Sequence, residues 1–384
     1  MTSAPRRPEL APVHSYSISE RELSLGVFDQ VAPWGHEEVL YGFDPVSGLR
    51  TIVAIHSTAL GPALGGTRFY SYRSEDEALF DVLRLSRGMS YKAAAAGLDL
   101  GGGKAVIIGD PRTASGERLF RAYGRIIDSL QGRYITAEDV GTTSSDMEII
   151  RRETRWALGT PMEEGGSGDP SPMTARGLLA AVQAVAEHLW DSDDLSGRKV
   201  AVQGVGKVGY AYVELLMAAG AEVVAADSYE PTAVKVADDF GIKVVGPDEI
   251  LSIDCDILSP CAMGAVFDDT TIPALACAAI AGSANNQLLD DTHADLIADR
   301  GILYAPDFVV NAGGLINVAE ELRGYSRQRA LHRVEHLRRA TAKILAEAET
   351  VGVSPHQAAV ARAERRMKDI GDLRRFRRSG DDRN

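Results

Sequence analysis

Two lysines stand among small residues, where a lysine head group is able to meet a substrate. Lys104 follows three glycines in GLDLGGGKAVIIGD (residues 97–110), and Lys92 lies in RGMSYKAAAAG (residues 87–97). Two lysines in one cleft would each lower the pKa of the other, through desolvation and like charge. A lysine whose pKa reaches about 7–8 is a competent general base near neutral pH. The ordinary alternative is a lysine that starts a strand with its head group in water, since most lysines are exposed.

The GGGK segment does not fit a phosphate-binding loop. The pattern G-x-x-x-x-G-K-[ST] would need a glycine at position 98 and a hydroxyl group at position 105. These positions hold Leu98 and Ala105, so both tests fail. Lys104 is therefore available for acid–base chemistry.

A second glycine motif, GVGKVG at residues 204–209, fits a dinucleotide-binding turn. The strand-like RKVAVQ precedes it, a helical pattern follows it, and Asp227 ends the next strand, AEVVAAD. In such a turn the glycines let the backbone approach a pyrophosphate at the positive end of the helix, and the acid binds the ribose. An ordinary β–α turn is the alternative, but the strand, the glycines, the helix and the acid all agree. The predicted cofactor residues here are Gly204, Val205, Gly206, Lys207, Val208, Gly209 and Asp227.

Asp227 also indicates which dinucleotide binds. A carboxylate repels a 2′-phosphate, and residues 228–234 (SYEPTAV) supply no arginine or lysine to bind one. We therefore expect NAD rather than NADP.

The chain of 384 residues is longer than one hydrophobic core usually spans, which predicts two domains. Hydrophobic spacing predicts strands at residues 38–55, 104–109 and 133–137, and helices after Ser74 and at residues 117–130. After a loop at residues 163–172, a helix and then a strict strand–helix alternation follow. This alternation is typical of a parallel sheet with helices on both faces. A last amphipathic helix is expected at about residues 328–350.

Composition and charge exclude several classes of function. The net charge of −13 repels nucleic acid and anionic membranes, and no run of 18 apolar residues would span a bilayer. The first 20 residues are polar and lack a secretory apolar stretch. The three cysteines (Cys255, Cys261 and Cys277) have no CxxC spacing, and their odd number argues against a disulfide framework. We expect a cytoplasmic protein with a small-molecule substrate.

The segment HRVEH (residues 332–336) matches the zinc-peptidase pattern H-x-x-E-H. Arg333, Arg338 and Arg339 crowd the same predicted helix, and nothing nearby suggests a substrate cleft. Short motifs match by chance often enough that we expect no metal site.

Seven segments in order resemble the leucine, valine and phenylalanine dehydrogenase branch of the glutamate dehydrogenase superfamily, over about residues 35–350. They are STALGPALGGTRFY, RGMSYKAAAAGLDLGGGKAVIIGDP, YITAEDVGT, GGSGDPSPMTARG, QGVGKVG, GSANNQL and YAPDFVVNAGGLINVAEEL. The resemblance implies NAD-dependent, reversible oxidative deamination of an L-amino acid to a 2-oxo acid and ammonia. It also implies a homo-oligomer.

The fold class implied is α/β, with two domains and a C-terminal helix that packs back on the first domain. A substrate-binding and oligomerisation domain would cover residues 21–162 together with the helix at 328–350, and a Rossmann-type NAD domain would cover residues 163–327. Residues 1–20 are expected to form a flexible tail and residues 365–384 a charged tail.

The resemblance also assigns roles to single residues. Lys92 would pair with the substrate α-carboxylate, Lys104 would be the base that activates water, and Asp139 would exchange a proton with the departing nitrogen. Gly65 and Gly66 would line the pocket with bare backbone. The residues expected to hold the nicotinamide and its ribose are Thr174, Ala284, Asn285 and Asn311. Asp139 has one structural alternative, as the N-cap of a helix at residues 144–151.

The substrate side chain is expected to be apolar. In glutamate dehydrogenases a lysine precedes the glycine pair and a serine lines the same pocket, whereas the matching residues here are Leu64 and Val318. A glutamate side chain would then be buried without a partner. Ala137 resembles branched-chain enzymes, and Leu315 forms a larger wall that favours a shorter substrate. We expect branched-chain substrates (valine, leucine or isoleucine), with phenylalanine as the alternative.

A non-catalytic NAD-binding sensor of the same fold is the competing class of function. It predicts the loss of Lys92, Lys104 or Asp139, and all three are present.

Overall fold

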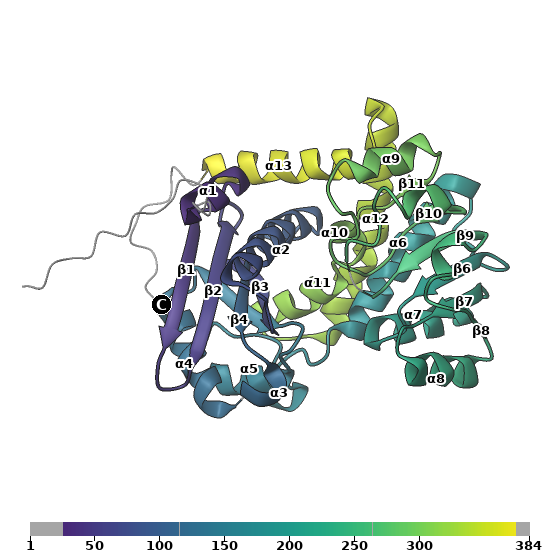
Figure 1. Cartoon of the computed structure of the whole chain (residues 1–384). Coiled ribbons are helices and arrows are strands. Elements are labelled where there is room, and N and C mark those ends of the chain that lie inside the picture. Colours follow the sequence, from purple (N-terminus) through teal and green to yellow (C-terminus); the bar gives the residue numbers. More distant parts are fainter. Residues whose placement is uncertain (1–25, 115, 263, 374–384) are drawn as a thin grey trace, which may run out of the picture.

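The computed structural model describes residues 26–114, 116–262 and 264–373, which form two β-sheets with helices around them (Figure 1). The predicted tail at residues 1–20 lies outside the described residues, as do residues 374–384 of the predicted C-terminal tail. Within the described ranges, none of the helices has the length and apolar character that crossing a bilayer requires. The three cysteines carry free thiols.

The first sheet is mixed and has the strand order β1-β2-β4-β3-β5. Its strands are β1 (Glu38–Asp44), β2 (Leu49–Ser57), β3 (Ala63–Tyr70), β4 (Gly101–Ile108) and β5 (Tyr134–Glu138). β1, β2 and β4 pair antiparallel, whereas β3 lies between β4 and β5 and runs parallel to both. The strands predicted at residues 38–55, 104–109 and 133–137 are therefore confirmed, and β3 is an addition.

Helices cover both faces of this sheet. α2 (Glu75–Ala95) packs Leu79 and Val82 on one face, and α4 (Glu117–Ser129) and α5 (Ser144–Arg151) pack on the other, where Phe69 and Tyr123 are buried. α2 begins after Ser74, whose hydroxyl accepts a hydrogen bond from the Glu77 N–H, as the capping motif predicts. Two short helices complete this half, α1 (Val27–Val31) and α3 (Pro111–Ala114).

The second sheet has six parallel strands in the order β8-β7-β6-β9-β10-β11. They are β6 (Lys199–Gln203), β7 (Glu222–Ala226), β8 (Lys243–Val244), β9 (Cys255–Pro260), β10 (Cys277–Ile280) and β11 (Leu303–Tyr304). The helices of this half are α6 (Ser171–Trp190), α7 (Lys207–Ala218), α8 (Glu230–Phe240), α9 (His293–Asp299), α10 (Asp307–Val310) and α11 (Gly313–Ala319). The strand order reverses at β6, which is the doubly wound dinucleotide-binding arrangement. The α/β fold class is thus confirmed.

Two C-terminal helices return the chain to the first half. α12 (Arg327–Val351) matches the predicted helix, and α13 (Pro355–Leu373) then crosses the molecule to α2 (Figure 1). Residues 365–373 belong to α13, so the prediction of a charged tail from residue 365 is wrong. This helix buries only a narrow stripe of alanines (Ala358, Ala359 and Ala363), which packs near Tyr91 of α2. Because these small residues stand among charged neighbours, the sequence pattern of the segment predicts a polar tail.

An apolar cluster joins the two halves. Leu64 and Ala137 of the first sheet lie in the same cluster as Leu315 and Val318 of α11 and Leu337 of α12. Burial of this shared surface stabilises the arrangement of the two sheets, because its apolar area would otherwise face water.

Replacing Leu337 by alanine is expected to destabilise the protein by about 2–5 kcal/mol, since it leaves a cavity in the shared cluster. Leu337 is only 1 % exposed, whereas Leu296 on α9 is 41 % exposed and provides the matched control. The thermal unfolding midpoint should fall for Leu337→Ala and change little for Leu296→Ala. Equal shifts in the two variants would contradict this account of the cluster.

Candidate active site

Alternation along three neighbouring strands brings the candidate residues to one face of the first sheet. Pairing of Leu64 with Gly102 and of Thr67 with Ala105 sets Gly66 of β3 beside Lys104 of β4. On the other side, Gly66 pairs with Ala137 of β5. Side chains alternate between faces with a period of two. The face therefore carries Leu64, Gly66, Arg68, Lys104, Ala137 and Asp139.

Gly66 lies between the strands of Lys104 and Ala137 and contributes no side chain to this face. The chain after β5 packs closely against its backbone. A methyl group there would lie 2.5 Å from the Glu138 carbonyl oxygen and 2.9 Å from Cβ of Asp139. Gly65 points to the opposite face with Thr67, so it offers the site its backbone alone.

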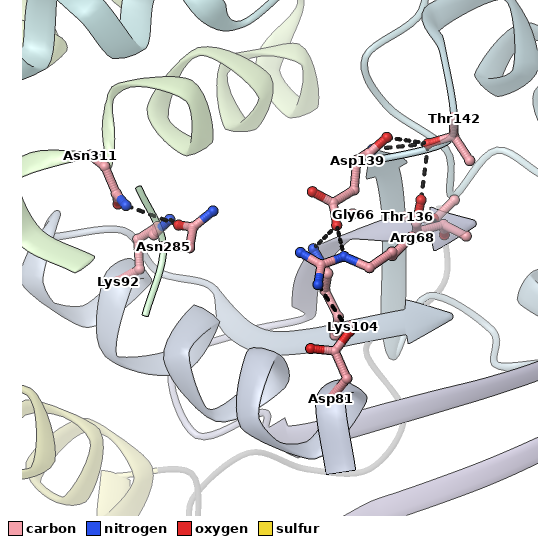
Figure 2. Close-up of polar contacts among 12 residues, drawn as sticks. Gly66, Arg68, Asp81, Lys92, Lys104, Thr136, Asp139, Thr142, Asn285 and Asn311 are labelled. Atoms are coloured by element: carbon pink, nitrogen blue, oxygen red, sulfur yellow. Dashed lines mark hydrogen bonds and ion pairs between the residues drawn. The ribbon is translucent and has the colours of Figure 1, made fainter. Parts of the chain in front are cut away.

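Lys104 and Asp139 form a buried ion pair. Nζ of Lys104 lies 2.7 Å from Oδ2 of Asp139, and the two side chains are 7 % and 17 % exposed. Arg68 meets the same carboxylate oxygen through Nε at 3.3 Å (Figure 2). The candidate base and the candidate proton carrier are therefore in direct contact.

Burial and neighbouring charges tune both groups. Burial lowers the pKa of Lys104, the nearby Arg68 cation lowers it further, and Asp139 opposes both. Burial alone would raise the pKa of Asp139, but the Lys104 and Arg68 cations overcome it and bring the pKa to about 2. Asp139 is thus ionised at neutral pH, and the ammonium of Lys104 gives up its proton more readily than an exposed lysine does.

Asp139 is held by its backbone and does not cap a helix. Its N–H donates to Oγ1 of Thr142 at 2.9 Å, and Thr142 donates in turn to the Thr67 carbonyl at 2.9 Å. The N-cap of α5 is Thr143, whose side chain accepts from the Asp146 N–H. The alternative of Asp139 as that N-cap is therefore wrong.

Lys92 reaches across to the second half of the molecule. Its Nζ donates to Oδ1 of Asn285 at 2.8 Å, and Nδ2 of Asn311 donates to the same oxygen at 2.9 Å (Figure 2). Burial lowers the pKa of Lys92 to about 8, with Lys104 adding to the effect and Asp307 and Asp139 opposing it. Lys104 thus lowers the pKa of Lys92, as expected, whereas the cation that lowers the pKa of Lys104 is Arg68. Asn285 and Asn311, predicted to hold the cofactor, also border the candidate carboxylate-binding lysine.

The apolar residues of the predicted pocket lie together. Leu64, Ala137, Leu315 and Val318 are all buried in the cluster that joins the two halves. Leu64 and Ala137 share the strand face of Lys104, and the other two come from α11. The four residues thus bring together apolar surface from both halves of the protein.

The GVGKVG turn has the geometry of a dinucleotide site. Gly204 has a positive φ of 91°, and a methyl group on Gly209 would lie 2.0 Å from the Gly204 carbonyl oxygen, so only glycine allows this approach of α7 to β6. A methyl group on Gly206, the N-cap of α7, would meet open space. Oδ2 of Asp227 accepts a hydrogen bond from the Val205 N–H at 2.8 Å, which sets the acid beside the turn.

The remaining predicted cofactor residues lie around the neighbouring helix ends. Thr174 lies in the first turn of α6, and a methyl group on Gly314 would meet its Oγ1 at 2.7 Å. Nδ2 of Asn311 lies 3.5 Å from the carbonyl of Ala284. Lys207 and Val208 open α7, where Nζ of Lys207 lies 3.5 Å from Asp169. In the described part of the chain, no group of three side chains suits a metal ion.

A dinucleotide-type turn in one half and a buried lysine–carboxylate pair in the other are features that a hydride-transferring enzyme combines, which indicates the class of dehydrogenases. Two family models match it: "Glu/Leu/Phe/Val dehydrogenase, dimerisation domain" over residues 42–156, and "Glutamate/Leucine/Phenylalanine/Valine dehydrogenase" over residues 165–230 and 229–374. The chain belongs to the Glu/Leu/Phe/Val dehydrogenase family and is an amino-acid dehydrogenase.

Similar proteins cover nearly the whole chain. A leucine dehydrogenase of Bacillus cereus is 48% identical over 94% of this chain and 99% of its own length. A valine dehydrogenase of Streptomyces virginiae is 50% identical over 87% of this chain and 94% of its own. The crystal structure of L-tryptophan dehydrogenase from Nostoc punctiforme has a TM-score of 0.76 at 42% identity, and covers 90% of this chain and 99% of its own. The resemblance found in the sequence is confirmed.

Sequence reasoning missed three polar residues of this face. Arg68, Asp81 and Tyr72 form a connected group behind Asp139, with Arg68 Nη1 2.9 Å from Asp81 and the Tyr72 hydroxyl 2.7 Å from it. The signal for Arg68 was its place two residues after Gly66, which puts both on one strand face.

Replacing Gly66 by alanine is expected to displace Asp139, because the new methyl group would overlap the Glu138 backbone. A misplacement of about 1 Å at a reacting group costs up to about a hundredfold in rate. Amino-acid dehydrogenase activity should fall accordingly, while the circular dichroism spectrum stays that of the wild type.

The matched control is Gly88→Ala on α2, where the nearest atom to a new methyl group is Oδ1 of Asn286, at 3.7 Å. That variant should retain activity. A fully active Gly66→Ala enzyme would show that the strand face tolerates a side chain at this position.

Proposed function

We propose that this protein catalyses the reversible, NAD-dependent oxidative deamination of a branched-chain L-amino acid to the 2-oxo acid and ammonia. The observation that carries the proposal is the buried Lys104–Asp139 pair, 2.7 Å apart, on the strand face where Gly66 leaves no room for a side chain. A lysine whose pKa is lowered by burial, next to an ionised carboxylate, suits proton transfer near neutral pH.

The chain's residues divide the work as follows. Lys92 pairs with the α-carboxylate and so fixes Cα of the substrate. Lys104, when neutral, takes a proton from water as the water adds to the substrate imine, and Asp139 exchanges a proton with the departing nitrogen. NAD, when bound, supplies the acceptor for the hydride that leaves Cα. Holding these groups in register removes much of the entropic barrier.

The apolar wall supports a branched-chain substrate. Leu64, Ala137, Leu315 and Val318 offer no polar partner, so the side-chain carboxylate of glutamate would be buried unpaired. Similarity to a leucine and a valine dehydrogenase at 48% and 50% identity favours an aliphatic side chain. Phenylalanine is the second candidate, and the likeness to an L-tryptophan dehydrogenase at 42% identity supports it.

The GVGKVG turn supports NAD as the cofactor. Glycine as the N-cap of α7 leaves the N–H groups of the first helical turn open to a pyrophosphate. Asp227 lies at the end of β7, where its charge favours a ribose with free hydroxyls over a 2′-phosphate. Thr174, Ala284, Asn285 and Asn311 are assigned to the nicotinamide and its ribose.

A homo-oligomer also forms part of the proposal. The family model matched over residues 42–156 is that of a dimerisation domain. Tyr41 and Phe43 on the edge strand β1 are 49 % and 70 % exposed, and an apolar edge of this kind suits a second copy of the chain.

The purified protein is expected to reduce NAD with valine, leucine or isoleucine as substrate. With glutamate, kcat/KM should be lower by a factor of about a thousand or more, because an unpaired buried charge costs several kcal/mol. Lys104→Ala should lower turnover by about 10²–10⁴-fold, the usual contribution of a general base. The measurement is NADH absorbance with each amino acid.

Lys343→Ala, which removes an exposed lysine on α12, is the matched control and should remain active. Turnover confined to phenylalanine would keep the mechanism and overturn the pocket assignment. Tight NAD binding without turnover of any amino acid would favour the competing function, a non-catalytic NAD-binding sensor.

Asp227→Asn is expected to reduce the preference for NAD over NADP, because it removes the negative charge of the side chain and keeps its shape. The ratio of kcat/KM for NAD to that for NADP should fall about tenfold, which corresponds to about 1.4 kcal/mol. Steady-state kinetics with both cofactors measures this ratio. A wild-type enzyme with a lower KM for NADP than for NAD would refute the assignment.

A further inference from the structure

Arg68 lies between two carboxylates on the strand face of the candidate active site. It belongs to β3, the strand flanked by β4 with Lys104 and by β5, which leads to Asp139. Its Nη1 lies 2.9 Å from Oδ2 of Asp81 on α2, and its Nε lies 3.3 Å from Oδ2 of Asp139. One planar guanidinium thus connects α2 to the carboxylate that contacts Lys104 (Figure 2).

The group behind Arg68 is itself fixed. Oδ2 of Asp81 accepts a hydrogen bond from the Tyr72 hydroxyl at 2.7 Å. Burial and the adjacent carboxylate raise the pKa of Tyr72, which keeps its hydroxyl protonated as a donor. The side chains of Arg68, Asp81 and Asp139 are 20 %, 24 % and 17 % exposed, so water screens these contacts only in part.

Charge and shape both matter at this position. Two cations, Lys104 and Arg68, contact the same oxygen of Asp139. The carboxylate of Asp81 offsets the charge of Arg68. A guanidinium is planar and directs its donors in a rigid fork, so it fixes the direction of the carboxylates that it binds. A lysine at the same place would supply the charge without this geometry.

We propose that Arg68 is a positioning residue for the Lys104–Asp139 pair: by bridging Asp81 and Asp139, it holds Oδ2 of Asp139 against Nζ of Lys104. The inference rests on the proposed function, because it assigns to Arg68 the support of the proposed catalytic pair. Asp81 and Tyr72 complete the support from α2 and from the segment after β3.

Other charged groups also face the pair, and they set its background. Lys104, Asp139 and Asp307 of α10 all act on Lys92 of α2. Glu138 is the immediate neighbour of Asp139 in sequence, and Asp169 and Lys207 act on Glu138. These groups are unchanged in the variants below, so differences between variants report on Arg68 and Asp81.

The signs of the expected shifts follow from the charges. Arg68 lowers the pKa of Lys104, and Asp81 raises it. Removing the arginine charge in Arg68→Met should therefore raise the pKa of Lys104, and removing the carboxylate charge in Asp81→Asn should lower it. Opposite shifts from two neighbouring residues are not expected from general loosening of the fold.

The first readout needs no turnover. The chain has eight lysines, so the NMR spectrum of protein labelled with ¹³C at lysine Cε contains few signals. The signal that disappears in Lys104→Ala is that of Lys104. Its titration should move up in pH in Arg68→Met, move down in Asp81→Asn, and stay near the wild type in Arg68→Lys. The matched control, Arg198→Met, removes an arginine paired with Asp256 in the second sheet and should leave the titration unchanged.

The second readout is the kinetics with the preferred amino acid. In Arg68→Met, kcat should fall by up to about a hundredfold while KM for the amino acid changes little, since the ground-state contacts remain. In this variant the acidic and the basic limbs of the pH profile of kcat should both move to higher pH, as the Lys104 titration does. In Arg68→Lys the limbs should return to their wild-type positions while kcat stays reduced, because the bridge is lost.

These readouts distinguish a failure of the positioning role of Arg68 from a failure of the proposed function. An unshifted Lys104 signal in Arg68→Met and Asp81→Asn, or shifts of one sign in both, overturns the role of Arg68. Full kcat in Arg68→Lys also overturns it, because charge alone would then suffice. If Arg68→Met does not fold, the direction of the shift in Asp81→Asn decides. Absence of turnover in the wild type, with the predicted opposite shifts, would refute the proposed function and leave the positioning geometry intact.

Discussion

The site depends on one constraint, which is that the ammonium of Lys104 is buried. A charge taken out of water is costly unless a partner and hydrogen bonds replace the water. Asp139 is that partner, at 2.7 Å, and its carboxylate is in turn tied to Arg68. Because burial still lowers the pKa of Lys104 after this pairing, the residue is held between a stable cation and a usable base.

Small residues follow from the same constraint. Gly66 and the glycines before Lys104 bring backbone close to the ion pair, and a methyl group on Gly102 would lie 2.0 Å from the backbone nitrogen of Ser90. α2 can therefore approach β4 closely enough to cover Lys104. The GVGKVG turn of the other half uses glycine in a related way, since Gly209 allows α7 to lie against β6. In both halves, glycine places a charge or a helix end next to the cleft.

The sequence carried much of this architecture, because strand alternation and helix periodicity are local patterns. The triple glycine before Lys104 and the G-x-G-x-x-G pattern at residues 204–209 singled out the lysine and the turn as candidates. The contacts of Arg68 were not accessible, since they require the register of β3 between β4 and β5. The bond from Lys92 to Asn285 joins residues 193 positions apart. α13 was missed because three buried alanines among charged residues carry a weak hydrophobic signal.

The apolar cluster that joins the two halves has an evolutionary consequence. Its members Leu64 and Ala137 belong to the first sheet, and Leu315 and Val318 to α11 of the dinucleotide half. A gene fusion that exchanged the dinucleotide half between relatives would transplant one wall of the apolar cluster together with the cofactor turn. Inheritance of the two halves is therefore coupled, because an exchanged dinucleotide half brings its own α11 residues against Leu64 and Ala137.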